Sequence, residues 1–592
     1  MKDFLKHTLA TVVGIFAFTL IVGAFGVMSI IGMVAASDAT TEVKDNSVLV
    51  LNLSGTMEER AQDNPIGGIL GDVGTQSGLD DMLSAIKKAK TNDKIKGIYI
   101  EGGMFSPDSY ASLQALRREL ADFKKSGKWI VAYADIYTQG VYYVASVANK
   151  VWINPQGMIE WHGLASQPIF FKDVMSKFGV KMQVAKVGKY KSMPEMFTAD
   201  KMSDSNRAQV KAYIDGIWSN VCKDVASSRK VSVAQLNNVA DGLAMFDDPK
   251  NYQKEGLVDK YLYADEVKGE IKKMLKLSDD DDINRLSIAD MSTVEGEKKK
   301  GDEIAVYYAY GSVVDGKQGG DAVSGSNAVI DAQVVCRDIE KLMDDDDVKA
   351  VVLRVNTGGG SAYASEQIWH SLKKLRTKKP LVVSMGGMAA SGGYYISSIA
   401  NWIVAEPTTL TGSIGIFGMF PDFSGLLTEK LGVKFDEVKT NRNSGFGTMA
   451  RPFNQEEMAY LTAYVERGYS LFLSRVAEGR KMSVAKVDEV AQGHVWLGQD
   501  AIKVHLVDEL GGLDKAVSKA AKLAKLDEYH THPYPAKTDW LDNILGSISH
   551  KNYLDGQMRV TLGEYYEPFI LMRDIKNTDA IQARVPFELN IK

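Results

Sequence analysis

Two stretches of this chain, Lys94-Ile-Lys-Gly-Ile-Tyr-Ile100 and Asp347-Val-Lys-Ala-Val-Val-Leu353, repeat one pattern of charged and apolar residues. Other segments recur at the same spacing of about 250 residues, which is the length of a domain and not of a solenoid unit. The matching pairs are Tyr142-Tyr143 with Tyr394-Tyr395, Val147-Ala-Asn149 with Ile399-Ala-Asn401, Arg229-Lys-Val-Ser-Val-Ala234 with Arg480-Lys-Met-Ser-Val-Ala485, and Leu257-Val-Asp259 with Leu506-Val-Asp508. We therefore expect two copies of one domain.

Both copies alternate short apolar runs with amphipathic stretches. The predicted strands are Ser47–Leu53, Gly97–Ile100 and Trp129–Tyr133 in the first copy, and Ile304–Tyr310, Ala350–Val355 and Leu381–Met385 in the second. Asp80–Lys90 and Ala364–Leu375 are predicted as helices between them. Strands that alternate with helices indicate an α/β fold built from βαβ units around a largely parallel sheet.

The N-terminus predicts a membrane anchor. Lys2 and Lys6 precede an uncharged, largely apolar run from Leu9 to Ala36, which exceeds the roughly 20 residues that a helix needs to span a bilayer. Positive charge before the run and acidic residues after it place the N-terminus in the cytoplasm. The rest of the chain would then lie on the extracytoplasmic (periplasmic) side of the inner membrane. Cleavage near Val34-Ala-Ala-Ser37, as in a signal peptide, is the alternative.

Composition excludes several function classes. A chain of 592 residues is too long for a single hydrophobic core, so two or more domains are expected. A net charge of −5 gives no support to nucleic-acid binding. Cys222 and Cys336 are the only cysteines, too few for a disulfide framework or for thiol or zinc chemistry. We expect neither a metal nor a cofactor.

The stretch Ser384-Met-Gly-Gly-Met-Ala-Ala-Ser-Gly-Gly-Tyr-Tyr395 predicts a reactive hydroxyl at Ser391. Small neighbours leave this side chain accessible, as in a strand-to-helix turn that carries a nucleophile. A capping serine at a packed helix N-terminus is the alternative. At the repeat spacing Ser391 aligns with Gln139, which cannot act as a nucleophile.

A glycine cluster in the second copy, Asn356-Thr-Gly-Gly-Gly-Ser361, follows a predicted strand. Such a cluster exposes backbone N–H groups to an anion and would form an oxyanion hole if it lay near Ser391. A plain tight turn is the alternative. A phosphate-binding loop is disfavoured, since the Lys-Ser/Thr of a P-loop is missing.

A serine nucleophile needs a general base, and the first copy contains the candidate. None of the 8 histidines lies close in sequence to a serine in a triad pattern, although a sequence-distant histidine remains an alternative. Val187-Gly-Lys-Tyr-Lys-Ser192 offers Lys191, which aligns with Ser444 of the second copy. This complementary loss indicates one composite site per chain. Lysine serves as a base only when burial lowers its pKa from about 10.4; otherwise Lys191 is an ordinary surface residue.

The chain resembles the long, duplicated form of signal peptide peptidase A, a membrane-anchored serine protease with a Clp protease and crotonase fold. The motifs that carry the resemblance are Gly188-Lys-Tyr-Lys-Ser192, Asn356-Thr-Gly-Gly-Gly-Ser361, Ala389-Ala-Ser-Gly-Gly-Tyr-Tyr395 and Leu410-Thr-Gly-Ser-Ile-Gly-Ile-Phe-Gly418. The roles that it implies are Ser391 as nucleophile, Lys191 and not Lys189 as general base, Gly359 and Gly392 as oxyanion donors, and Ser413 as the residue that orients the lysine. Gly358 departs from the family, which often has proline there.

The resemblance further implies a homotetramer that degrades apolar signal peptides in or at the lipid bilayer. The predicted segments are residues 1–8 (cytoplasmic), 9–36 (transmembrane anchor), 45–265 (first repeat domain, with the lysine), 266–302 (linker), 303–527 (second repeat domain, with the serine) and 528–592 (C-terminal extension). A crotonase-type enzyme acting on acyl-CoA and a non-catalytic membrane scaffold are the alternatives.

Overall fold

The computed structural model describes residues 40–61, 76–296, 299–316, 328–537 and 581–585, together with scattered positions between Phe4 and Ile21. Most of the predicted anchor, 9–36, lies outside the described residues. Among the residues that are described, no helix has the length and apolar character needed to cross a membrane.

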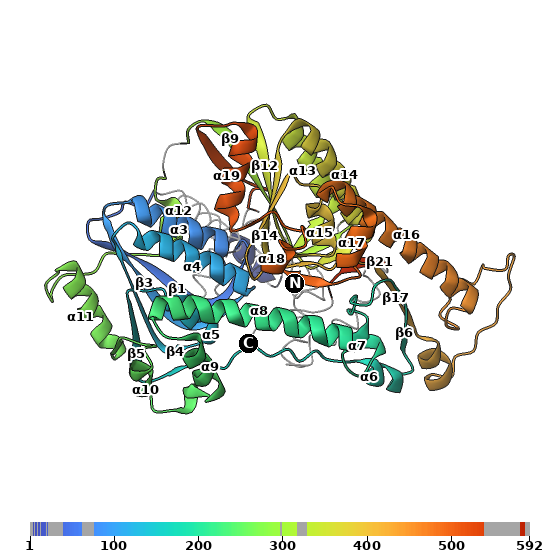
Figure 1. The fold of residues 1–592 in the computed structure, drawn as a ribbon, viewed down its shortest axis with the longest axis horizontal. Helices are drawn as coiled ribbons and strands as arrows, with labels where there is room; N and C mark the ends of the chain where they lie inside the picture. The colour runs from blue at the N-terminus through green and yellow to red at the C-terminus, as the bar shows by residue number, and fades with distance from the viewer. Residues whose placement is uncertain are drawn as a thin grey trace.

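The first repeat is built on a seven-stranded parallel sheet, in which β1 and β3 are drawn in blue and β4 and β5 in teal in Figure 1. Its strands run in the order β2-β1-β3-β4-β5-β7, and β8 pairs with β1. The bounds are β1 Ser47–Glu58, β2 Gln76–Gly78, β3 Ile95–Pro107, β4 Trp129–Tyr137, β5 Lys150–Ile159, β7 Lys260–Tyr261 and β8 Arg285–Leu286. The helices of this part are α3 Leu79–Thr91, α4 Tyr110–Lys124, α5 Gln139–Ala145, α6 Lys172–Lys177, α7 Glu195–Thr198, α8 Asp204–Arg229, α9 Val233–Asp241, η1 Ala244–Phe246, α10 Asn251–Lys254, α11 Ala264–Leu275 and α12 Ile288–Thr293.

The second repeat has an eight-stranded, mostly parallel sheet in the order β18-β16-β14-β12-β9-β20, with β15 beside β14 and β19 beside β15. Its strands are β9 Asp302–Tyr310, β12 Val348–Thr357, β14 Leu381–Ala390, β15 Trp402–Ala405, β16 Leu410–Gly412, β18 Val495–Leu497, β19 Glu509–Leu510 and β20 Tyr529–Tyr534. Its helices are α13 Ala332–Asp344, α14 Ala362–Lys378, α15 Gly392–Ser397, η2 Leu426–Lys430, α16 Gln455–Arg480, α17 Val484–Val490, α18 Gly498–Ala501 and α19 Leu513–Ala524.

The α/β prediction is confirmed, since all six predicted strands and both predicted helices lie within observed elements. The strands form where apolar runs can be buried on both faces, as expected for a parallel sheet covered by helices. In β12, only Lys349 is exposed and every other side chain is buried or half-buried.

The duplication is visible in the two longest described helices. Helices α8 and α16 have 26 residues each. Each starts at a polar cap, Ser203 or Asn454, whose side chain accepts a backbone N–H of the first turn. Each ends at a lysine in the left-handed conformation, Lys230 or Lys481. In Figure 1, α8 runs from the first sheet to the elements of the second repeat.

A third sheet joins distant parts of the chain in the order β11-β10-β13-β21-β17-β6. Its strands are β6 Lys181–Lys186, β10 Ser312–Val314, β11 Val329–Asp331, β13 Gly359–Ser361, β17 Phe417–Asp422 and β21 Ile581–Arg584. Strand β6 comes from the first repeat and pairs antiparallel with β17 of the second, from Lys186 opposite Phe417 to Lys181 opposite Asp422. This ladder fixes the segment that follows β6 against the second repeat.

A buried ion pair also holds the repeats together. Arg354 on β12 donates from Nε to Glu59 Oε1 at 2.7 Å and from Nη2 to Oε2 at 3.2 Å. Only 4% of either side chain is exposed. Asn356, two residues further, donates to Glu59 at 3.1 Å and to Asp108 at 2.7 Å. The residues just before the glycine cluster are thus held by acidic groups of the first repeat.

Replacing Glu59 with alanine is expected to lower the free energy of unfolding by about 3–5 kcal/mol, because it leaves the Arg354 guanidinium buried without its partner. Denaturant unfolding of the full chain measures this change. Lys211→Ala removes an exposed pair with Asp215 and should shift the free energy by less than about 1 kcal/mol. Equal shifts in the two variants would contradict a structural role for the buried pair.

Candidate active site

Ser391 stands at the turn between β14 and α15 in an unusual backbone conformation. Its φ of 55° and ψ of −111° lie outside the regions that L-residues commonly adopt. The Ser391 amide donates to Gly412 O at 2.8 Å. The expectation of an accessible side chain is wrong, because neighbouring residues pack around the turn and Ser391 is fully buried. A strained serine between a strand and a helix has the geometry of a nucleophile elbow.

Ser413 emerges beside Ser391 because their strands are paired. Strands β14 and β16 are parallel, with Ala390 opposite Gly412, so the next residue of each strand leaves the sheet at the same edge. Ser413 has a φ of 48° and donates its amide to His494 O at 2.7 Å. Two adjacent hydroxyls therefore project from one sheet edge.

Lys191 reaches both hydroxyls from the first repeat. Its Nζ lies 2.7 Å from Ser391 Oγ, 3.0 Å from Ser413 O and 3.1 Å from Ser413 Oγ. The lysine backbone is packed against Gly493, where an added methyl group would come within 2.6 Å of Lys191 N. The structure thus brings together three of the predicted residues across a sequence separation of 200 positions between Lys191 and Ser391.

The Lys191 amine is held without a counter-charge. Its side chain is 0% exposed, and among the described residues no carboxylate forms an ion pair with it. Burial lowers the pKa of Lys191 well below its usual value, since the interior disfavours the ammonium. A neutral amine has two N–H groups, which match the two Ser413 oxygens, and one lone pair, which matches the Ser391 hydroxyl.

The glycine cluster lies against the turn that follows Ser391. A methyl group added to Gly392 would come within 3.1 Å of Gly359 Cα. Gly359 has a φ of 103°, in the region that favours glycine, and its N–H donates to Thr357 Oγ1 at 3.0 Å. The predicted donors Gly359 and Gly392 are therefore neighbours, but the Gly359 N–H already has a partner.

The equivalent positions of the first repeat carry no such site. Gln139 begins α5 after β4, as Gly392 begins α15 after β14 and Ser391. Its amide donates to Tyr110 Oη at 2.8 Å and to Gly163 O at 3.1 Å, and its oxygen accepts two backbone N–H groups. In the second repeat, Ser444, which aligns with Lys191 of the first, is exposed. The first repeat has thus kept the turn and given it structural contacts.

Sequence reasoning missed His494, which lies beside the lysine loop. Its ring is 4.4 Å from that of Tyr190 and 4.2 Å from that of Trp496. Burial lowers the pKa of His494 to about 4, so this imidazole is neutral at ordinary pH. Strand pairing between β16 and β18 places it there, and no short-range pattern reports that pairing. Among the described residues, the basic group that contacts the Ser391 hydroxyl is the amine of Lys191.

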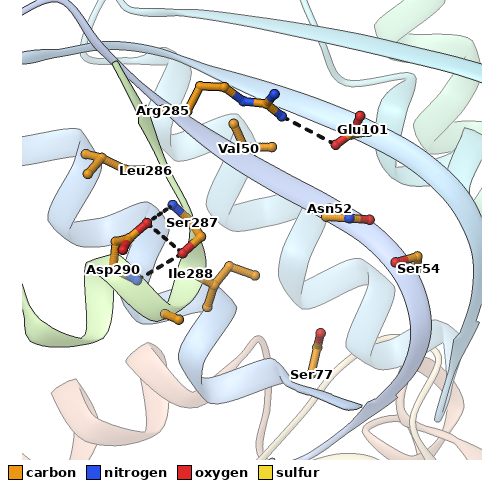
Figure 2. A pocket seen from close by; sticks show the side chains of 11 residues that line it. Val50, Asn52, Ser54, Ser77, Glu101, Arg285, Leu286, Ser287, Ile288 and Asp290 are labelled. Atoms are coloured by element: carbon orange, nitrogen blue, oxygen red, sulfur yellow. Dashed lines mark hydrogen bonds and ion pairs between the residues drawn. The ribbon is translucent and has the colours of Figure 1, made fainter. Parts of the chain in front are cut away.

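A separate cavity of about 480 Å³ opens on the first repeat. Figure 2 shows interactions between the residues that line it, among them an ion pair of Arg285 with Glu101 at 3.6 Å and a hydrogen bond that the Ser287 hydroxyl donates to Asp290. Its lining residues are Val50, Asn52, Ser54, Ser77, Glu101, Arg285, Leu286, Ser287, Ile288, Ala289 and Asp290. None of the predicted site residues lines it.

Comparison with known proteins identifies the class. Residues 122–278 and 373–527 each match peptidase family S49, and the two matches fall one in each repeat. The chain is 36% identical to Protease 4 of Salmonella typhi, covering 93% of this chain and 88% of that protein. It is 29% identical to the chloroplastic serine protease SPPA of Arabidopsis thaliana, covering 92% and 78% respectively. A putative signal peptide peptidase SppA of Enterococcus faecium is 34% identical over 35% of this chain and 61% of its own.

The chain belongs to peptidase family S49. It is a serine protease with an α/β fold that contains two S49 regions.

Replacing Lys191 with methionine is expected to abolish proteolysis and to stabilise the fold at pH 7. The unfolded chain protonates this lysine at pH 7, whereas the lowered pKa opposes protonation in the folded chain. Wild-type stability therefore rises with pH between the lowered pKa and about 10.4, and the advantage of the variant shrinks over that window. Denaturant unfolding at pH 7 and pH 10 measures both quantities.

The matched control is Lys189→Met, which changes an exposed lysine two residues away. This variant should keep wild-type activity and show no pH-dependent gain. Loss of activity in Lys189→Met with retention in Lys191→Met would reverse the assignment of the base.

Replacing Ser413 with alanine should lower kcat by about 3–10-fold, because the Lys191 amine loses one hydrogen bond and keeps the one to the Ser413 carbonyl. The pH at half-maximal activity should shift as well, since the hydroxyl contacts the titrating atom. Ser398→Ala removes a buried hydroxyl that bonds to Tyr395 O and should leave the pH profile unchanged. Identical profiles for wild type and Ser413→Ala would show that this hydroxyl does not orient the base.

Proposed function

We propose that this protein is a membrane-anchored endopeptidase that cuts peptide bonds with a Ser391–Lys191 dyad. The observation that carries the proposal is the contact of 2.7 Å between a fully buried, uncompensated lysine amine and a serine hydroxyl in a strained turn. Lysine in this state is a base, and the hydroxyl is the group whose proton it can take.

The reaction follows from the positions of these groups. The lone pair of Lys191 accepts the Ser391 proton while Oγ bonds to the substrate carbonyl carbon. When the carbon–nitrogen bond breaks, Lys191 returns that proton to the departing amine. Water then attacks the Ser391 ester, gives its proton to Lys191 and frees the acid, and the lysine reprotonates Ser391.

The oxyanion would be held by backbone amides at the same turn. Gly392 is the first residue of α15, where an N–H has no partner within the helix. From the glycine cluster we propose Gly360 in place of Gly359, because the Gly359 N–H is engaged by Thr357. A helix N-terminus next to a glycine turn suits the negative charge of the tetrahedral intermediate.

For the substrate we propose apolar signal peptides in or at the lipid bilayer. The apolar run at 9–36 would anchor the chain in the cytoplasmic membrane, with the catalytic repeats on the periplasmic side. The name of the Enterococcus faecium relative points to the same substrate class. We further propose that each repeat is a Clp protease/crotonase-like unit.

We propose that the protein is a homotetramer, and an apolar segment between β17 and α16 supports contact between copies of the chain. Its exposed side chains are Leu431, Val433, Phe435, Val438, Phe446 and Met449, and Val438 is 99% exposed. Monomers rarely leave so many large apolar side chains in one segment facing water. Contact with other copies of the chain would cover them.

Replacing Ser391 with alanine should reduce cleavage of an apolar peptide by roughly 10³-fold or more, because the nucleophile is lost and only binding and the oxyanion amides remain. Lys191→Ala should give a similar loss. The measurement uses the full chain in detergent and a quenched fluorescent peptide, with unfolding midpoints to verify that both variants fold. Full activity in either variant would overturn the dyad.

A further inference from the structure

The side-chain amide of Gln209 holds the lysine loop on both sides of Lys191. Gln209 lies near the start of α8 and is 1% exposed. Its Nε2 donates to Tyr190 O at 3.1 Å and to Ser192 Oγ at 3.1 Å. A third contact of the same nitrogen, 3.2 Å to Asn206 Oδ1, ties it to its own helix. Tyr190 and Ser192 are the chain neighbours of Lys191, so one amide restrains the lysine backbone from both directions.

The oxygen of the same amide reaches the second repeat. Gln209 Oε1 accepts the backbone N–H of Val495, the first residue of β18, at 3.2 Å. Strand β18 pairs with β16, where Val495 lies opposite Gly412. The Gly412 carbonyl accepts the Ser391 amide at 2.8 Å. A continuous path of hydrogen bonds and strand pairing therefore connects Gln209 with the nucleophile, and a shorter one connects it with the base.

The two repeats differ at this position, as they do at the predicted base and nucleophile. With the helix caps Ser203 and Asn454 aligned, Gln209 of α8 corresponds to Tyr460 of α16. Tyr460 is 56% exposed, whereas Gln209 is buried. Burying an amide is favourable only where its donor and acceptor groups are bonded. The copy that supplies the base is thus the one that keeps a buried amide here.

We propose that Gln209 is a positioning residue of the dyad, which keeps Lys191 Nζ and Ser391 Oγ at hydrogen-bond distance across the boundary between the repeats. This role rests on the proposed function and adds to it a residue that touches neither the substrate nor the reacting atoms. Without the amide, the lysine loop would lose its link to β18 and admit water. Water at the Lys191 amine would stabilise the ammonium, so the dyad would lose both its geometry and its neutral base.

The experiment compares Gln209→Met with Gln139→Met, using the full chain in detergent and a quenched fluorescent apolar peptide. Gln209→Met should lower kcat by about 10–100-fold with KM little changed, because a displacement of reacting groups by about 1 Å costs on the order of 10²-fold. Gln139→Met is the matched control, since it removes a buried amide of the same repeat that contacts neither Lys191 nor Ser391. This control should keep the wild-type kcat.

The pH profile of kcat separates positioning from a loss of stability. Wild-type activity falls on the acid side as the Lys191 amine is protonated, and burial is what lowers its pKa. Gln209→Met should therefore move the pH at half-maximal kcat upward by about one unit, whereas Gln139→Met should leave it in place. The other ionisable groups around the lysine loop are unchanged in both variants; they are Lys189, Tyr190, Glu195 and His494.

A wild-type kcat and pH profile in Gln209→Met would overturn the inference, and so would equal changes in the two methionine variants. Unfolding midpoints show whether each variant folds. If Gln209→Met does not fold, Gln209→Asn takes its place, because its shorter side chain keeps an amide that cannot span from Tyr190 O to Val495 N. It should show both changes in the same direction, and wild-type behaviour of this variant would count equally against the inference.

The wild-type reaction separates the two claims. If wild type cleaves the peptide while the Gln209 variants match it in kcat and pH profile, the inference alone is overturned. If wild type leaves the peptide intact, the proposed function is overturned, and the role of Gln209 with it.

Discussion

The site depends on one unfavourable placement, the burial of the Lys191 amine with no carboxylate beside it. An ammonium in that position would lose its hydration with no opposite charge to compensate for it, so the interior stabilises the neutral amine. The fold must then hold the lysine loop rigidly, because water reaching the amine would restore its ordinary basicity. The pairing of β6 with β17 and the packing of Gly493 on the lysine backbone provide that support.

The duplication explains how the chain accommodates the unfavourable burial of the Lys191 amine. Two copies of one fold offer two equivalent turns between a strand and a helix, at Thr138 and at Ser391, and Lys191 contacts the hydroxyl of the second repeat. In the first repeat Gln139, the first residue of the helix after the turn, forms hydrogen bonds to the surrounding backbone and to Tyr110. The first repeat contributes the lysine and, through Glu59 and Asp108, positions Asn356 before the glycine cluster. One repeat thus supports the chemistry of the other.

Much of this organisation was predictable from local patterns. The apolar runs of β1, β3, β4, β9, β12 and β14 are read correctly, since burial on both faces leaves a continuous apolar sequence. These strands are longer than predicted, because strand pairing extends past the apolar residues. Ser391 and Lys191 could be chosen because the two copies differ at those positions. The partner of the Gly359 amide could not be predicted, since Thr357 Oγ1 reaches it only in this particular turn.

The sequence by itself determined the α/β class, the duplication and the two residues that differ between the copies in a chemically useful way. Those features are local or repeated, so they can be recognised without coordinates. Only the tertiary structure decided that Lys191 contacts Ser391, that His494 lies beside the lysine loop, and that residues 581–584 enter the site as a strand. Each of these depends on pairing between strands far apart in the chain, and such pairing leaves no periodic trace in the sequence.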